Sequence, residues 1–201
     1  MRPLNIPSDG HQLGELIAGR YPREIDVADR EDAGSGRLTL TPMVPSDWQF
    51  LETFLRAVPN AEQRFFRQDT TIAERVEQWC SELDYRHILP LLAWSGDRIV
   101  ADAVLEQEPG LWSAHVGKIR MLVHPEFRRR GIGGRLLREL VELARELGLH
   151  KLVYECAADQ TELMDHLKRC NFISAARLPD FIRDREGKLH DMVLMVRSVA
   201  A

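Results

Sequence analysis

One segment of this chain is more informative than any other: Met121-Leu122-Val123-His124-Pro125-Glu126-Phe127-Arg128-Arg129-Arg130-Gly131-Ile132-Gly133-Gly134. Its apolar first part is typical of a strand, and its arginines and glycines lead directly into a long amphipathic helix. Glycines let a backbone approach a ligand closely, and the first turn of a helix offers unpaired N–H donors with a partial positive charge. Arginines add forked donors that suit phosphate. The segment therefore predicts a pyrophosphate cradle for a nucleotide or a coenzyme.

The composition suits a single globular domain and argues against several classes of protein. The chain has 201 residues, of which 44% are hydrophobic and 29% charged. Its net charge of −4 argues against a dedicated nucleic-acid binder. No apolar run is long enough to span a membrane, and residues 1–10 lack the apolar centre of a signal peptide, so we expect a cytoplasmic protein. Cys80, Cys156 and Cys170 are odd in number and widely spaced, so we expect neither disulfides nor a metal site.

Two regions of different character follow one another along the chain. Residues 1–36 are rich in Pro, Gly and charge, and we interpret them as an N-terminal extension, ordered in part, with one amphipathic piece near 13–18. Residues 37–201 show regular apolar periodicity and form the predicted main domain.

Periodicity and turn residues predict alternating strands and helices in the main domain. Ser46 with Gln49, and Thr71 with Glu74, are capping-box signals at the starts of two helices. The predicted strands are 37–43, 89–94, 99–105, 114–123, 151–156, 172–178 and 191–196, and the predicted helices are 48–58, 72–83, 131–147 and 161–168. This order predicts an α/β fold with a mixed sheet.

The cradle also resembles a known family. Arg128-x-x-Gly131-x-Gly133 is similar to the Q/R-x-x-G-x-G/A signature of the GNAT superfamily of acetyl-CoA-dependent N-acetyltransferases. The strand before it, and the helix, strand and second helix after it, agree with that family's order. The resemblance fades upstream and is absent before about Arg37. It implies the GNAT (acyl-CoA N-acyltransferase) fold, with a mixed, mostly antiparallel central sheet flanked by helices, and makes 37–201 the N-acetyltransferase domain.

The resemblance also implies the ligands. Acetyl-CoA would be the cosubstrate, and the acceptor would be a small-molecule amine or an amine of a peptide or protein. The acyl-pantetheine arm would lie in a gap beside the strand that precedes the cradle, and the backbone N–H of Leu122 or Val123 would be the oxyanion donor. The residues that would bind the coenzyme are Met121, Leu122, Val123, Arg128, Arg129, Arg130, Gly131, Ile132, Gly133, Gly134, Arg135 and Gln160.

Two other interpretations of the cradle are weaker. A dinucleotide site needs glycine at position 136, where the chain has Leu136, although Glu155 lies at a spacing that suits a ribose-binding acid. The other is a surface turn with solvated arginines. The chain contains no G-x-x-x-x-G-K-S/T sequence, which excludes a P-loop.

The catalytic groups are less clearly marked than the cradle. An alkylammonium with a pKa of about 10.4 must lose a proton before it attacks, and the candidate bases are His115, Glu155 and a water chain to solvent. The position that carries a tyrosine general acid in many family members holds Leu167 here. That substitution motivates a second hypothesis, a non-catalytic acyl-CoA-binding or regulatory domain.

The acceptor is not determined by the sequence. Lys118 and Arg120 alternate with apolar residues, which is consistent with a solvated face or with a partner for a substrate carboxylate. In the family that this chain resembles, two segments select the acceptor. Here they are residues 59–70 and 179–190, and both carry mixed charges. The sequence does not determine the oligomeric state either, and a homodimer is compatible with it.

Overall fold

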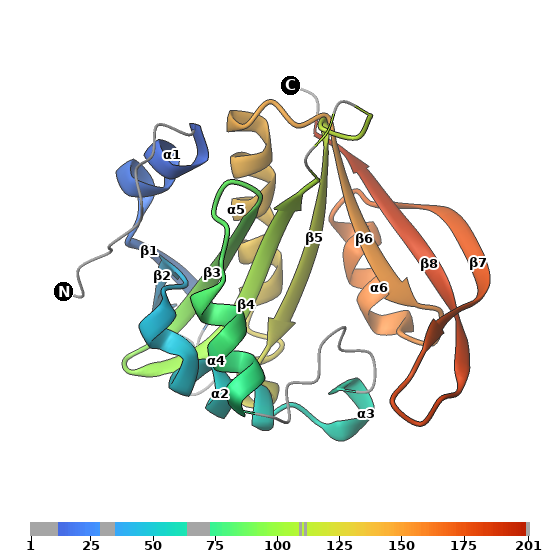
Figure 1. The fold of residues 1–201 in the computed structure, drawn as a ribbon, viewed down its shortest axis with the longest axis horizontal. Coiled ribbons are helices and arrows are strands. Elements are labelled where there is room, and N and C mark those ends of the chain that lie inside the picture. The colour runs from blue at the N-terminus through green and yellow to red at the C-terminus, as the bar shows by residue number, and fades with distance from the viewer. Residues whose placement is uncertain (1–11, 29–34, 64–72, 109, 111, 200–201) are drawn as a thin grey trace.

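The fold is given by a computed structural model that describes residues 12–28, 35–63, 73–108, 110 and 112–199. Within these residues, eight strands form one sheet in the order β1-β2-β3-β4-β5-β6-β8-β7 (Figure 1). Neighbouring strands are antiparallel except β5 and β6, which are parallel. The strands are β1 (Arg23–Ala28), β2 (Ser35–Pro42), β3 (Ile88–Ser95), β4 (Arg98–Gln107), β5 (Val116–Val123), β6 (Lys151–Ala157), β7 (Ile173–Arg183) and β8 (Leu189–Ser198). The expected mixed, mostly antiparallel sheet is confirmed.

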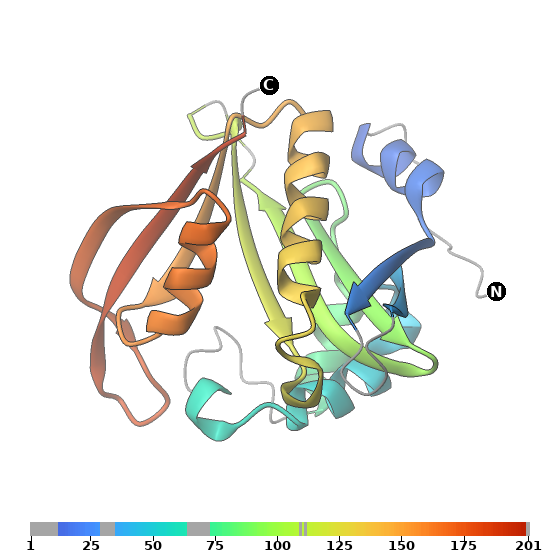
Figure 2. The same cartoon turned by 180° about the vertical axis from the view of Figure 1, so that it is seen from behind.

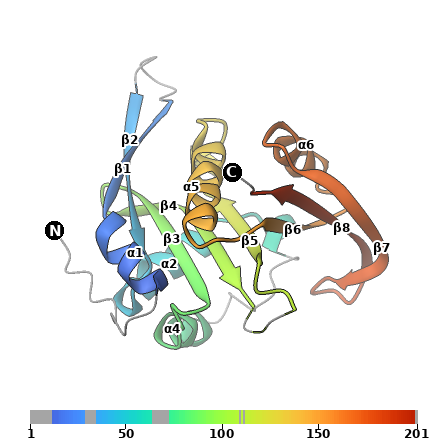
Figure 3. The same cartoon turned by 90° about the horizontal axis from the view of Figure 1, so that it is seen from above.

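Helices cover both faces of the sheet. The α-helices are α1 (Gln12–Arg20), α2 (Trp48–Arg56), α3 (Asn60–Gln63), α4 (Ala73–Ser81), α5 (Ile132–Glu146) and α6 (Thr161–Arg169). Helices α5 and α6 lie together on one face (Figure 2), and α2 and α4 lie on the opposite face (Figure 3). Each face has its own apolar cluster, one packed under α5 and α6 and one under α2 and α4.

Helix α5 is the central element of the larger cluster. Its apolar stripe points into the sheet, and its fully or almost fully buried residues are Ile132, Leu136, Leu137, Leu140, Val141, Leu143 and Ala144. Fully burying one large aliphatic side chain contributes about 1.5–3 kcal/mol. The helix ends where the sequence predicts, because Gly148 adopts the left-handed φ of 70° that follows many helix C-termini. This packing fixes the start of α5 beside the end of β5.

Residues 12–28 pack onto the same core as the main domain. Ile17, Tyr21 and Ile25 are at most 5% exposed and belong to the α5 cluster. Glu139 of α5 accepts hydrogen bonds from Arg20 Nε (2.7 Å) and the Tyr21 hydroxyl (2.8 Å). The predicted amphipathic piece near 13–18 is therefore part of helix α1, while the boundary between an extension and a domain near residue 37 stays a prediction.

The two predicted capping boxes have different outcomes. A short 3₁₀ turn, Pro45–Asp47, precedes α2, so the N-cap is Asp47 and the capping box predicted from Ser46 is wrong. The Asp47 carboxylate instead accepts the backbone N–H of Val44 at 3.0 Å. The second box depends on Thr71, which lies outside the described residues.

Candidate functional site

The sheet opens between its two parallel strands. Strands β5 and β6 are paired only along Val116–Lys118 and Lys151–Val153. Beyond this ladder β5 stays paired with β4 as far as Val123, and β6 stays paired with β8 as far as Ala157 (Figure 1). We call the space between the diverging ends, along residues 119–123 of β5, the β5–β6 gap. One backbone edge of β5 faces this gap without a neighbouring strand.

The hydrogen bonds show which backbone groups face the gap. The Tyr154 hydroxyl of β6 accepts the N–H of Met121 and donates to its carbonyl, both at 3.2 Å. The N–H of His124 points the other way and donates to Val100 of β4 at 2.8 Å. Because strand residues alternate in direction, Val123 faces the gap together with Met121, whereas Leu122 faces β4. Of the two expected oxyanion donors, Val123 is the one that the backbone turns toward the gap.

The N-terminus of α5 opens beside this gap. Gly131, the N-cap, has a left-handed φ of 77°, which favours glycine. The first intrahelical bond runs from Arg135 N–H to the Gly131 carbonyl at 3.0 Å, so the N–H groups of 132–134 precede the helical ladder. A Cβ on Gly133 would lie 3.9 Å from Val123 Cγ2. The helix N-terminus and the gap therefore meet at Gly133, as an anion site next to an acyl site requires.

The arginines of the cradle have different surroundings. Arg128 donates through Nε to the Val123 carbonyl at 3.0 Å and through both terminal nitrogens to Glu62 at 2.7 and 2.8 Å. Its guanidinium therefore links the end of β5 to α3, and its charge is already compensated. The Arg130 guanidinium lies over the Phe127 ring, 4.9 Å from its centroid. Arg129 is exposed, and Arg135 is half-buried in the first turn of α5.

His166 is a site residue that the sequence reasoning missed. It lies on α6, and its Nε2 is buried without a hydrogen-bond partner among the described residues. A Cβ on Gly133 would be 3.6 Å from this nitrogen, and a Cβ on Gly134 would be 3.7 Å from the ring's Cε1. Burial lowers the pKa of His166, and Arg169 lowers it further. The neighbouring Leu167 is fully buried in the core. The family pattern points only to position 167, so no sequence signal identified His166.

Gln160 and His115 have different places in the fold. Gln160 is the N-cap of α6, and its Oε1 accepts the Ala157 N–H at 2.9 Å. His115 is exposed before the start of β5, and its ring lies 5.8 Å from that of His150. Since Leu122 is seven residues further along the strand, His115 is about 23 Å from the functional end of β5 at about 3.3 Å per residue. The structure does not bring His115 to the cradle.

Glu155 does lie close to the gap. Its side chain lines a small pocket on the face covered by α2 and α4, together with Val104, Glu106, Lys118, Ile119, Arg120 and Val153. Lys118 is ion-paired with Glu108. The Arg120 guanidinium lies over the Trp79 ring of α4, 5.2 Å from its centroid. This pocket lies on the face of the sheet opposite α5.

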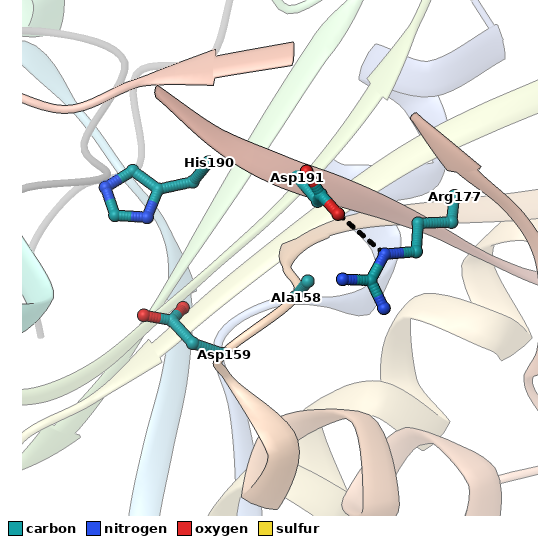
Figure 4. A pocket seen from close by; sticks show the side chains of 5 residues that line it. All are labelled: Ala158, Asp159, Arg177, His190 and Asp191. Atoms are coloured by element: carbon teal, nitrogen blue, oxygen red, sulfur yellow. Dashed lines mark hydrogen bonds and ion pairs between the residues drawn. The ribbon is translucent and has the colours of Figure 1, made fainter. Parts of the chain in front are cut away.

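A second pocket lies between the end of β6 and the start of β8. Figure 4 shows its lining residues, Ala158, Asp159, Arg177, His190 and Asp191. Arg177 pairs with Asp191 at 2.7 Å and holds the pKa of that carboxyl below its usual range. Arg185 of the same hairpin donates to Gln63 of α3 at 3.5 Å. The two segments expected to select the acceptor therefore touch, while residues 64–70 lie outside the described residues.

Two other features, a metal-binding cluster and a membrane-spanning helix, are not found in the described part of the chain. Within it, no group of three or more His, Cys, Asp or Glu side chains is arranged to hold a metal ion. None of its helices combines the length and the apolar character that crossing a bilayer requires.

A mixed sheet that opens beside a glycine-rich helix N-terminus is the arrangement that the resemblance to GNAT acetyltransferases implied. The chain belongs to the GNAT acetyltransferase family, because the profile of the Acetyltransferase (GNAT) family matches residues 51–172, well over half of its length. The match begins within α2, ends just after α6, and includes the gap and the cradle. No curated protein sequence matches the chain.

Solved structures of other acetyltransferases share the fold. A GNAT-family acetyltransferase from Streptococcus pneumoniae is 21% identical, with a TM-score of 0.67 over 80% of this chain and 99% of that one. A ribosomal-protein-alanine N-acetyltransferase from Brucella melitensis is 22% identical, with a TM-score of 0.68 over 79% and 98%. An N-acetyltransferase from Staphylococcus aureus is 14% identical, with a TM-score of 0.70 over 81% and 99%. At these identities the likeness establishes the fold alone.

Proposed function

We propose that the protein is an N-acetyltransferase that transfers the acetyl group of acetyl-CoA to a primary amine by direct attack. The observation that carries this proposal is the orientation of the β5 backbone. Met121 presents its N–H and carbonyl, and Val123 its N–H, to the β5–β6 gap, where an extended acyl-pantetheine arm could pair with them. Membership of the GNAT family supports the same chemistry.

The cradle residues supply the coenzyme site in this proposal. The N–H groups of 132–134 and the dipole of α5 favour the pyrophosphate. Arg129 and Arg135 add positive charge there. The guanidinium of Arg128 is already paired with Glu62, so Arg128 contributes to the cradle only through its backbone. Gln160 orders the turn before α6 through Ala157.

The Val123 N–H stabilises the developing oxyanion in this scheme. Acetyl transfer passes through a tetrahedral intermediate whose negative oxygen needs a fixed donor, and one such donor is worth about 2.7–4 kcal/mol of barrier. The carbonyl of Val123 is held by Arg128 Nε at 3.0 Å, which fixes the orientation of this part of the strand. In this scheme the β5–β6 gap would receive the acyl-pantetheine arm, the N-terminus of α5 the pyrophosphate, and the Val123 N–H the oxyanion, all within a few residues of sequence.

Thiol release from acetyl-CoA tests the proposal directly. The protein is incubated with acetyl-CoA and a panel of small amines, amino acids, polyamines and lysine peptides, and acetylated products are confirmed by mass spectrometry. We expect amine-dependent release with at least one member of the panel. The alternative of a non-catalytic acyl-CoA-binding domain is favoured by the burial of Leu167, which provides no proton donor. Tight CoA binding without turnover on any amine would support that alternative.

A further inference from the structure

The small pocket beside the β5–β6 gap contains a cation that is open to a ligand. Arg120 of β5 is half-buried there, and among the described residues its guanidinium takes part in no ion pair and no hydrogen bond. Its Nε is closed to solvent, so the two terminal nitrogens are the donors left open. A guanidinium that has lost part of its hydration normally binds a carboxylate or a phosphate, because these anions match its forked donors. Arg120 therefore indicates a ligand that carries an anion.

The Trp79 ring of α4 supports the Arg120 guanidinium. The guanidinium carbon lies over the ring, 5.2 Å from its centroid, within the range of a cation–π contact. Such a contact uses the charge of the group and not its hydrogen-bond donors, so the donors stay available. It also orients a long side chain before any ligand arrives, which lowers the entropic cost of binding. Arg120 is therefore prepared for a contact with an anion.

The other charged side chains of this pocket are Lys118, Glu106 and Glu155. Lys118 is ion-paired with Glu108 and lies directly opposite Glu106 in the β4–β5 register, so its charge is compensated. Glu155 lines the pocket from β6, on the other side of the gap from Arg120. The pocket therefore presents charge of both signs, which suits a zwitterion better than a simple cation or anion.

A purely structural role for Arg120 would be to balance Asp102 of β4. Asp102 is 7% exposed, and Arg120 acts on it electrostatically. Among the described residues the two side chains form no ion pair within 4.0 Å, and Asp102 does not line the pocket. The attraction therefore acts at longer range, and the terminal nitrogens of Arg120 keep their donors for a ligand. The two roles predict different effects on acceptors with and without a carboxylate.

The pocket borders the closed end of the β5–β6 gap. The last parallel pair joins Lys118 to Val153, and the pocket lining includes Arg120 and Glu155, which lie just beyond that pair on the two strands. Arg120 is three residues, about 10 Å along the strand, from Val123, where the thioester would lie. An acceptor bound to Arg120 must therefore extend along the gap, with its amine at one end and its anion at the other.

We propose that Arg120 is a specificity-determining residue that binds a carboxylate of the acceptor, so that the acceptor is an amino acid or another small amine with a carboxylate. This inference rests on the proposed N-acetyltransferase function and names the chemical class of its acceptor. The terminal nitrogens of Arg120 donate to the carboxylate, and the charge of Glu155 suits the ammonium group. Glu106 and Glu155 would repel a doubly charged phosphate more strongly than a carboxylate. A polyamine would meet the charge of Arg120 unfavourably.

Acceptor pairs that differ only in the carboxylate test this assignment. The pairs are glycine, β-alanine and 4-aminobutyrate with their amides, which also vary the distance between amine and carboxylate, and kcat/KM is measured at saturating acetyl-CoA. The amine pKa differs within a pair, so the decisive quantity is the change in the acid-to-amide ratio between two proteins. Arg120→Met should lower this ratio by about 10- to 100-fold for the best pair, the effect of losing a hydrogen bond to a charged group. Only the value for the acid should fall. Phosphoethanolamine and spermidine should be poorer wild-type substrates than the best acid.

Two further variants complete the test. Arg120→Lys keeps the charge but not the forked donors, so it should retain part of the preference. Arg37→Met, on β2 three strands away from β5, removes an exposed arginine that is paired with Glu24, and it should leave the ratio unchanged.

Turnover of the amide reports whether each variant is folded and competent. A parallel fall for acid and amide in Arg120→Met would assign the arginine a structural role and overturn the inference. An unchanged ratio in that variant, or a wild-type preference for spermidine or phosphoethanolamine, would overturn it as well. A wild-type protein that turns over no amine would instead contradict the proposed function itself.

Discussion

The hydroxyl of Tyr154 lies 3.2 Å from both the backbone nitrogen and the carbonyl oxygen of Met121, where it takes the place of the missing neighbouring strand. Burial raises the pKa of Tyr154, so the hydroxyl stays protonated and serves as donor and acceptor at once. The gap is thus closed across Met121 by a side chain that a ligand arm could displace.

Tyr154→Phe should destabilise the free protein more than the CoA-bound protein. Without the hydroxyl, the Met121 N–H and carbonyl lose their partner, which costs about 1–3 kcal/mol for each unsatisfied buried group. A bound pantetheine arm would satisfy them again, so the rise in melting temperature on adding CoA should be larger in the variant. Equal destabilisation with and without CoA would show that the arm does not pair with Met121.

Glu62→Gln should tighten the binding of CoA by a few-fold at low salt. The substitution releases the Arg128 guanidinium from its bidentate partner and leaves an uncompensated positive charge beside the cradle. Both side chains are more than a third exposed, so the effect on stability should stay within about 1 kcal/mol. Calorimetric titrations at low and high salt measure the gain, and Glu52→Gln on α2, which breaks a similar pair with Arg56, is the control. Weaker binding in Glu62→Gln would mean that the ion pair shapes the site.

Glu139→Gln should lower stability by about 2–4 kcal/mol, because the carboxylate is 2% exposed and contacts two arginines. Arg20 and Tyr21 lower the pKa of Glu139 by hydrogen bonding, against the opposing effect of burial. A lowered folded-state pKa stabilises the protein above about pH 4.5, and this contribution is lost as the pH falls through the folded-state value. Urea unfolding between pH 3 and 7 should therefore show the two proteins converging at the acidic end. A pH-independent difference would point to packing alone.

Deleting residues 1–34 should destabilise the protein while leaving the CoA affinity of the folded fraction within a few-fold. The deletion removes the buried Ile17, Tyr21 and Ile25, together with Arg20. Strand β1 lies at the edge of the sheet, four strands away from β5, so the cradle keeps its own supports. Unfolding curves and CoA titrations separate the two effects. A truncated protein with unchanged stability would identify these residues as a dispensable extension.

The local features of the site could be predicted from the sequence. Short-range sequence patterns indicate the glycines at the helix start, the apolar stripe of α5 and the strand before the cradle. The structure has these features within a few residues of the predicted bounds. The likeness of the signature to a family also identified the correct fold.

The contacts that complete the site could not be predicted in this way. Arg128 meets Glu62, which is 66 residues earlier in the chain, and Arg120 meets Trp79 only through the packing of α4 on the sheet. His166 reaches Gly133 from another helix. Each contact depends on how distant elements pack, and no periodicity within a single element encodes it. The position of His115 could not be predicted either, because this residue directly precedes β5 in the sequence but lies at the opposite end of that strand from the cradle.

Calorimetric titration of CoA into the wild-type protein, Gly133→Ala and Gly133→Asp is the most direct test of the central claim. A Cβ at position 133 has only ordinary contacts of 3.6 and 3.9 Å, so the alanine variant should fold and bind CoA within about tenfold of wild type. The aspartate variant adds bulk and negative charge where the pyrophosphate should sit, so it should fold but show no measurable binding at millimolar CoA. If folded Gly133→Asp binds CoA as tightly as wild type does, the coenzyme does not occupy the N-terminus of α5 and the account is contradicted.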